Sequence, residues 1–195
     1  MLIVIEGSDK AGKATQTQLL ADRLAKERFS VKTCAFPDYS TKIGKEIKAL
    51  LHGKRDYPIE VRHMLLSANR WEKKRAIEGM LKANKVVILN RYYQSNLVYG
   101  LASGLKLEWL QSLDSGLPKE DLVIVLDVSP EVSIKRRQRE EDIFETNNDI
   151  MNNVSRLYRE FAIKYNWILI DGDRSEEEVH KEILKIVEEK IKQKH

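Results

Sequence analysis

Cysteine is nearly absent, with Cys34 the single thiol among 195 residues. One thiol cannot form a disulfide within the chain, so a disulfide-stapled fold is excluded. Disulfides belong to oxidising compartments, and their absence predicts a cytoplasmic protein. Cys34 lies among apolar residues in the stretch VKTCAF, which predicts a small buried hydrophobe.

Long apolar runs and metal-ligand spacings are also missing. Aliphatic runs such as LVIVL at 122–126 fall far short of the ~20 residues that span a bilayer, which predicts no association with membranes. The four histidines are spread along the chain without ligand spacing, so no protein-built metal site is expected. The apolar stretch MLIVIEG predicts a strand at once, with no signal peptide before it.

The charges are almost balanced. Lys and Arg number 34 against 30 Asp and Glu, giving a formal charge of +4. This small, dispersed excess suits an anionic ligand but does not indicate a nucleic-acid partner. No repeat or low-complexity tract divides the sequence, so we expect a single domain over residues 1–195.

Short aliphatic runs alternate with longer amphipathic stretches. The runs predict strands at 2–6, 31–35, 86–89, 122–127 and 167–170. Most of them are continuous apolar runs of four or five residues, which is typical of strands covered on both faces. Between them the apolar residues recur with helical spacing, most clearly at Val179, Ile183 and Val187. This alternation predicts an α/β fold, a parallel sheet with helices on both faces.

The stretch GSDKAGKATQ at 7–16 follows the first strand and opens a helix. Its spacing G-x-x-x-x-G-K predicts a phosphate-binding loop, in which Lys13 reaches the phosphates and backbone N–H groups surround them. The residue after the lysine is usually a Ser or Thr that reaches magnesium, but here it is Ala14. The hydroxyl of Thr15 can still bond a phosphate, and water can replace one magnesium ligand.

Four further segments follow the loop: FPDYSTKIG at 36–44, SANRWE at 67–72, NRYYQS at 90–95 and GLPKEDLVIVLD at 116–127. Together with EGSDKAGK they closely resemble the thymidylate kinases of eukaryotes, poxviruses and archaea. The resemblance implies the five-stranded P-loop fold of nucleoside monophosphate kinases. It also implies ATP-dependent phosphorylation of dTMP to dTDP for dTTP synthesis, Mg²⁺ as cofactor, a mobile lid at about 135–147 and a homodimer.

The same resemblance assigns site residues, with the acceptor bound by segments at about 36–72 and 90–100. It assigns ATP binding to Arg137 and Arg139 of the lid and to the loop residues Gly7, Ser8, Asp9, Lys10, Ala11, Gly12, Lys13, Ala14 and Thr15. It assigns binding of the acceptor nucleotide to Asp9, Phe36, Tyr39, Leu66, Arg70, Arg91, Ser95 and Tyr99. Arg91 matches the arginine on the acceptor phosphate, Arg70 the one facing thymine, and Asp9 the carboxylate near the sugar. The catalytic set is Lys13, Arg91, Asp9 and Arg136, with the choice among the lid arginines and Lys10 left open.

Some positions depart from the family pattern. Ala14 and Asn90 replace a hydroxyl and a carboxylate that face the metal, so we expect Mg²⁺ to be held mainly by nucleotide phosphates and water. Leu66 stands where a phenylalanine stacks on thymine, and Tyr39 where an arginine is common. Two alternatives therefore stay open: a kinase of broad deoxynucleoside monophosphate specificity, and a weakly active nucleotide-binding relative.

Overall fold

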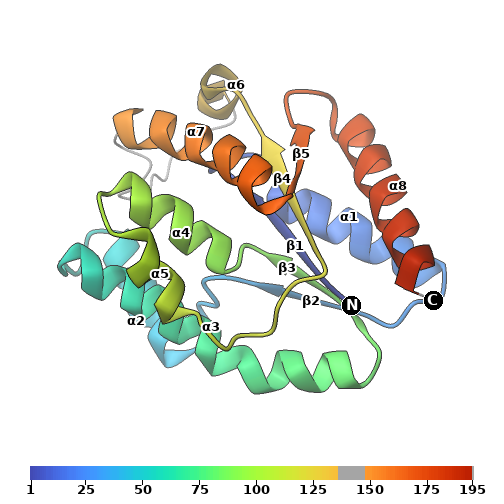
Figure 1. The fold of residues 1–195 in the computed structure, drawn as a ribbon, viewed down its shortest axis with the longest axis horizontal. Coiled ribbons are helices and arrows are strands. Elements are labelled where there is room, and N and C mark those ends of the chain that lie inside the picture. Colours follow the sequence, from blue (N-terminus) through green and yellow to red (C-terminus); the bar gives the residue numbers. More distant parts are fainter. Residues whose placement is uncertain (136–147, 195) are drawn as a thin grey trace.

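The computed structural model describes residues 1–135 and 148–194, and its strands form one parallel sheet (Figure 1). The strands are β1 (Leu2–Gly7), β2 (Val31–Ala35), β3 (Val86–Asn90), β4 (Leu122–Asp127) and β5 (Ile168–Asp171). They lie in the order β2-β3-β1-β4-β5, with every neighbouring pair parallel. The predicted five-stranded parallel sheet is confirmed.

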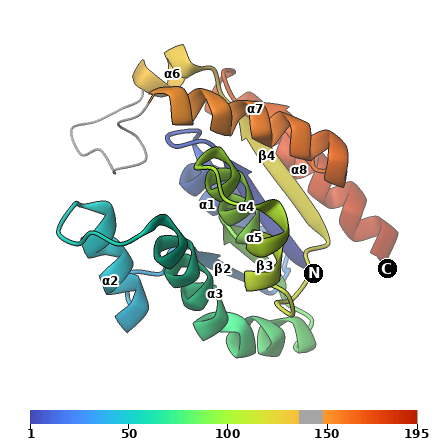
Figure 2. The same ribbon diagram turned by 60° about the vertical axis from the view of Figure 1, so that its left-hand side comes forward.

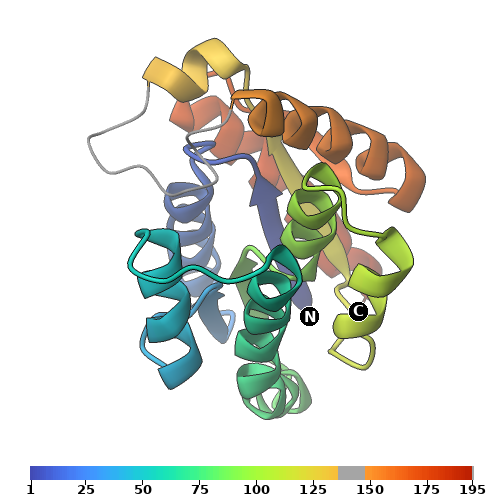
Figure 3. The same cartoon turned by 90° about the vertical axis from the view of Figure 1, so that its left-hand side faces the viewer.

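Helices cover both faces of this sheet. Those described are α1 (Lys13–Lys26), α2 (Lys42–Leu51), α3 (Ile59–Lys82), α4 (Tyr93–Ala102), α5 (Leu107–Leu113), α6 (Pro130–Lys135), α7 (Asn148–Tyr165) and α8 (Glu176–Lys194). Figure 3 shows β1 with α1 on one side and α4 on the other. α8 shares the face of α1, whereas α3, α5 and α7 share the face of α4. Figure 2 shows α2 beside α3 at the margin of the sheet.

The core follows from the two-residue period of the central strand. Leu2 and Val4 of β1 point to the α4 face, and Ile3 and Ile5 point to the α1 face, with no exposed area on any of the four. A strand buried on both faces needs this continuous apolar run. The carboxyl end of β1 is therefore fixed from every side.

Cover on both faces, predicted for most of the strands, does not extend to the edge strands β2 and β5. Lys32, Thr33 and Ala35 are exposed because β2 lies at the edge of the sheet. Cys34 on this strand is half-buried and packs against the core without being enclosed by it. Strand limits also differ: β1 continues to Gly7, β3 includes Asn90, and β5 runs from Ile168 to Asp171.

Among residues 1–135 and 148–194, no helix is both long and apolar enough to cross a membrane.

Gly44 in the first turn of α2 allows a close backbone approach. A Cβ added there would lie 1.8 Å from the carbonyl oxygen of Asp38. Because that neighbour is backbone, Gly44→Ala must displace the 36–39 loop, and we expect the free energy of unfolding to fall by about 1–3 kcal/mol. Urea denaturation measures the change.

Gly79 in α3 is the matched control, because a Cβ added there meets open space among the described residues. Gly79→Ala removes the flexibility of glycine from a helix and should stabilise the fold by about 0.5–1 kcal/mol. Equal unfolding free energies for the two variants would contradict the close approach at Gly44.

Candidate active site

The loop between β1 and α1 has the backbone geometry of an anion site. Gly7 has φ 140°, and a Cβ on it would lie 2.5 Å from the carbonyl oxygen of Leu126. Gly12 has φ 90° and leads directly into α1 at Lys13, whose Nζ donates to the carbonyl oxygen of Ser8 at 2.6 Å. The loop thus presents backbone N–H groups, a helix N-terminus and an ammonium group at one place.

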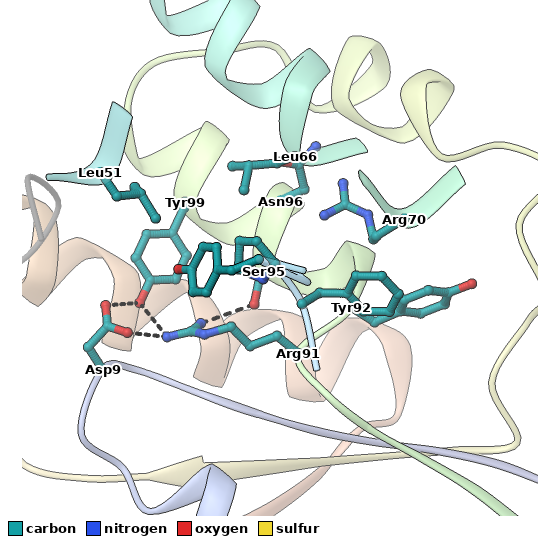
Figure 4. A pocket seen from close by; sticks show the side chains of 12 residues that line it. Asp9, Leu51, Leu66, Arg70, Arg91, Tyr92, Ser95, Asn96 and Tyr99 are labelled. Atoms are coloured by element: carbon teal, nitrogen blue, oxygen red, sulfur yellow. Dashed lines mark hydrogen bonds and ion pairs between the residues drawn. The ribbon is translucent and has the colours of Figure 1, made fainter. Parts of the chain in front are cut away.

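A hollow lies beside this loop at the carboxyl ends of β1 and β3, and we call it the acceptor hollow (Figure 4). The structure brings together there all eight residues assigned to the acceptor from the sequence: Asp9, Phe36, Tyr39, Leu66, Arg70, Arg91, Ser95 and Tyr99. Pro37, Leu51, Tyr92 and Asn96 complete the lining. Residues far apart in the sequence therefore share one small space.

Arg91 lies in the floor of the acceptor hollow, in the turn that joins β3 to α4. Its backbone is left-handed, with φ 65°, and its N–H donates to the carbonyl oxygen of Ile5 at 3.0 Å. Nη1 donates to Ser95 Oγ at 3.1 Å, and Nη2 forms an ion pair with Asp9. The guanidinium is thus held in place from two sides (Figure 4).

Asp9 and Tyr99 lie against this guanidinium. Burial would raise the pKa of the Asp9 carboxyl, but the charges of Arg91 and Lys13 outweigh burial and lower it. Burial and the charge of Asp9 raise the pKa of Tyr99 well above its usual range. Asp9 is therefore ionised and Tyr99 neutral, and the Tyr99 hydroxyl donates to Asp9 Oδ2 at 2.8 Å.

Arg70 forms part of the opposite wall. Its Nε and Nη2 donate to Asp114 Oδ1 and Oδ2 at 2.9 and 2.7 Å, and only 3% of the residue is exposed. Ser67 Oγ donates to the same carboxylate at 2.8 Å. This bidentate pair fixes the plane of the guanidinium before any ligand arrives.

Asn96 of α4 is a polar lining residue that the sequence reasoning missed. It is 1% exposed, and its Oδ1 lies 2.7 Å from Nδ1 of the buried His63. Burial lowers the pKa of His63 to about 4, so the imidazole is neutral at pH 7. A neutral ring that donates from Nδ1 orients the Asn96 amide. The aliphatic side chains of Leu51 and Leu66 line the hollow as well.

A second, more polar hollow follows the loop, and we call it the donor hollow. It is lined by Asp9 to Gln16, by Asn90 and Arg91, and by Gly172, Arg174, Glu176 and Val179 beyond β5. Asp9 and Arg91, together with Phe36, Pro37 and Tyr39, line both hollows. Two ligands bound in the two hollows would meet at Arg91.

Asn90 Oδ1 is buried without a hydrogen-bond partner in the described part of the chain. Its residue lines the donor hollow next to Lys13 and Ala14. An unused acceptor oxygen at this position suits a hydrated cation. Within the described ranges, His, Cys, Asp and Glu side chains form no group of three or more that could hold a metal ion.

The lid arginines Arg136, Arg137 and Arg139 lie outside the described residues. Two buried polar residues near the site were not predicted as site residues from the sequence: Glu6 on β1 and Tyr158 on α7. The predicted strand ends at residue 6, where a charged side chain is ordinary, so no local signal marked Glu6. No sequence pattern around Tyr158 predicts that it lies near the site.

Comparisons with known proteins agree with this geometry. The family model "Thymidylate kinase" matches residues 5–183. Thymidylate kinase of Schizosaccharomyces pombe is 39% identical over 190 residues, covering 95% of this chain and 90% of that protein. The human enzyme is 32% identical over 194 residues, covering 98% and 91%.

A solved structure of thymidylate kinase from Candida albicans superposes with a TM-score of 0.86 at 31% identity, covering 96% of this chain and 90% of that one. The family match spans nearly the whole sequence and includes the phosphate loop and both hollows. The chain belongs to the thymidylate kinase family.

Proposed function

We propose that the acceptor hollow binds dTMP and the donor hollow binds the phosphates of ATP, with Arg91 between them. As a member of its family the chain phosphorylates dTMP to dTDP. The observation that supports this division is that Asp9 and Arg91 line both hollows. A phosphate oxygen of dTMP can then approach the terminal phosphorus of ATP, and the bond to the leaving ADP oxygen breaks.

Phosphoryl transfer needs positioning and charge compensation more than covalent help from the protein. Lys13 supplies positive charge from the loop and Arg91 from the acceptor side. Asp9 and Tyr99 lie where the sugar of dTMP would face the loop. Arg70 and Asn96 lie deeper along the hollow and face the base, and their partners Asp114 and His63 hold them in orientation.

Mg²⁺, when bound, neutralises charge on the ATP phosphates. The structure offers Asn90 Oδ1 as the protein oxygen for the ion or for one of its waters. Ala14, exposed at the start of α1, offers none. We infer that nucleotide phosphates and water supply the remaining ligands, as Mg²⁺ prefers in kinases.

We also propose that the chain works as one kinase domain, in the cytoplasm and as a homodimer. Met64 and Trp71 on α3 are 46% and 38% exposed and supply apolar surface for a second copy. Exposed apolar side chains on one helix support an interface of this kind.

Release of ADP in a coupled assay with ATP, Mg²⁺ and dTMP tests the proposal that dTMP binds in the acceptor hollow and ATP in the donor hollow. Arg91→Ala should lower kcat by about a hundredfold or more, because one preorganised charge on the transferring group is lost. Arg156→Ala is the matched control, since Arg156 lies exposed on α7 and pairs with its helix neighbours. A wild type that releases no ADP would contradict the activity, and an active Arg91→Ala would contradict the role of Arg91.

Restoring both metal-facing groups tests how Mg²⁺ is held. The double variant Ala14→Ser/Asn90→Asp should lower the Mg²⁺ concentration for half-maximal rate by about tenfold and raise turnover. Calorimetric titration of ATP at several Mg²⁺ concentrations should show the same change without turnover. If neither the rate nor the Mg²⁺ dependence changes, Mg²⁺ does not depend on these two positions.

The presence of Leu66 supports a second candidate function, that of a kinase that phosphorylates several nucleoside monophosphates. Aliphatic Leu51 and Leu66 offer a base apolar contact without the geometry of ring stacking. Broad substrate specificity is known for the relative from Candida albicans, whose fold this chain shares.

A panel of deoxynucleoside monophosphates should therefore show a second acceptor besides dTMP. Leu66→Phe should lower the KM for dTMP by about threefold to tenfold through stacking on the base. Phosphorylation of dTMP alone in the panel would overturn the proposal of broad specificity.

A further inference from the structure

Glu6 is a buried carboxylate directly below the acceptor hollow. It has no exposed area, and it is not among the residues that line either hollow. Its Oε1 accepts the N–H groups of Tyr92 at 2.8 Å and Ser95 at 3.1 Å. Its Oε2 accepts the hydroxyls of Ser95 at 2.6 Å and Tyr158 at 2.8 Å. All four donors are neutral groups, and all four bonds end on the two oxygens of this one side chain, next to the Arg91 turn.

The first two bonds make Glu6 the cap of α4. Tyr92, at the N-cap position, provides no side-chain cap of its own. The first N–H groups of a helix have no partner within the helix, and a negative charge there is stabilising. Glu6 meets both needs from β1, and so fixes the start of α4 directly after Arg91.

The third bond determines which way the Ser95 hydroxyl points. A serine hydroxyl has one proton, and Ser95 donates it to Glu6. Its oxygen can then only accept on the other side, where Arg91 Nη1 donates to it at 3.1 Å. The carboxylate thereby makes Ser95 an acceptor toward the guanidinium.

The fourth bond brings in α7. Tyr158 is 2% exposed and donates to the same Oε2 as Ser95. Burial and the charge of Glu6 raise the pKa of Tyr158 well above its usual range, so its hydroxyl keeps its proton. One carboxylate therefore connects β1, α4 and α7 at a distance of two hydrogen bonds from Arg91.

We propose that Glu6 is a positioning residue for phosphoryl transfer, which orients Arg91 toward the acceptor phosphate through Ser95 and through the capped first turn of α4. The proposal rests on the role of Arg91 in binding dTMP. A carboxylate is required because only an acceptor without protons takes both hydroxyls and leaves Ser95 free to accept from Arg91. An amide in its place donates to Ser95 and competes with Arg91.

Glu6→Gln keeps the size of the side chain and an oxygen that caps α4. Toward Ser95, however, it replaces a hydrogen-bond acceptor with a donor. We expect dTMP to bind about tenfold more weakly, the loss typical of one misdirected bond to a charged group. Binding of ATP should stay within about twofold, because Ser95 and Tyr92, which Glu6 contacts, line the acceptor hollow and not the donor hollow. Calorimetric titration measures both affinities without turnover, and steady-state kinetics gives KM and kcat for each substrate.

Tyr158→Phe is the second variant, which guards against a Glu6→Gln protein that does not fold. Tyr93→Phe is its matched control. Tyr93 also donates its hydroxyl to a glutamate, Glu120, at 2.8 and 2.9 Å, but it lines neither hollow. We expect Tyr158→Phe to raise the KM for dTMP by about threefold and Tyr93→Phe to leave it unchanged.

Ser95→Ala tests the route through the hydroxyl. If Glu6 acts through Ser95, the double variant Glu6→Gln/Ser95→Ala loses less dTMP affinity than the sum of the single losses. A purely structural Glu6 would lower the melting temperature and leave the ratio of dTMP to ATP affinity unchanged. That result, fully additive losses, or equal effects of Tyr158→Phe and Tyr93→Phe would overturn the proposal.

Discussion

The carboxyl end of β1 is the constraint on which both hollows depend. The strand is hydrogen-bonded on both sides, with Ile5 in register with Asn90 of β3 and Gly7 in register with Leu126 of β4. The loop that carries Lys13 leaves from β1, and the turn that carries Arg91 leaves from β3. Neighbouring strands lie about 4.8 Å apart. The strand register therefore fixes the points from which the Lys13 loop and the Arg91 turn start, and contacts with Ser8 and Asp9 of the loop hold the two side chains.

Charge balance around Arg91 explains why two carboxylates lie so close to a site for anions. A buried guanidinium without a counter-ion is costly, and Asp9 supplies the partner. An incoming phosphate must then share Arg91 with Asp9. Its binding is favoured because the guanidinium of Arg91 is already held in orientation. Glu6 adds its charge from below, where its four neutral donors hold it away from the ligand. Arg91 is thus kept charged and oriented at a modest cost in anion affinity.

Local patterns were enough to predict the fold class and the phosphate loop. The strand runs and the glycine spacing are short-range features, and every acceptor residue assigned by resemblance lies in the acceptor hollow. Contacts across long sequence separations could not be predicted in this way. Arg70 pairs with Asp114, 44 residues away, and Glu6 with Tyr158, 152 residues away. The edge position of β2 depends on strand order, which the apolar pattern of the strand itself does not encode.

Glu6 shows how a strand limit can hide a functional residue. A predicted strand that ends at residue 6 leaves the glutamate at a boundary, where a charged side chain is ordinary. The observed β1 continues to Gly7, so Glu6 lies inside a strand that is buried on both faces. A charge in such a place must be satisfied by partners, and those partners identify its role.

Asn90 follows from the same crowding of charge. It is in register with Ile5, the residue before Glu6, and it lines the donor hollow that also includes Asp9. An aspartate there would place a third carboxylate at this end of the sheet, and its charge would repel that of Asp9. The amide keeps an acceptor oxygen in the same place and carries no charge. Asn90 therefore lowers the electrostatic repulsion in the site before a cation binds and leaves more of the attraction for Mg²⁺ to the nucleotide phosphates.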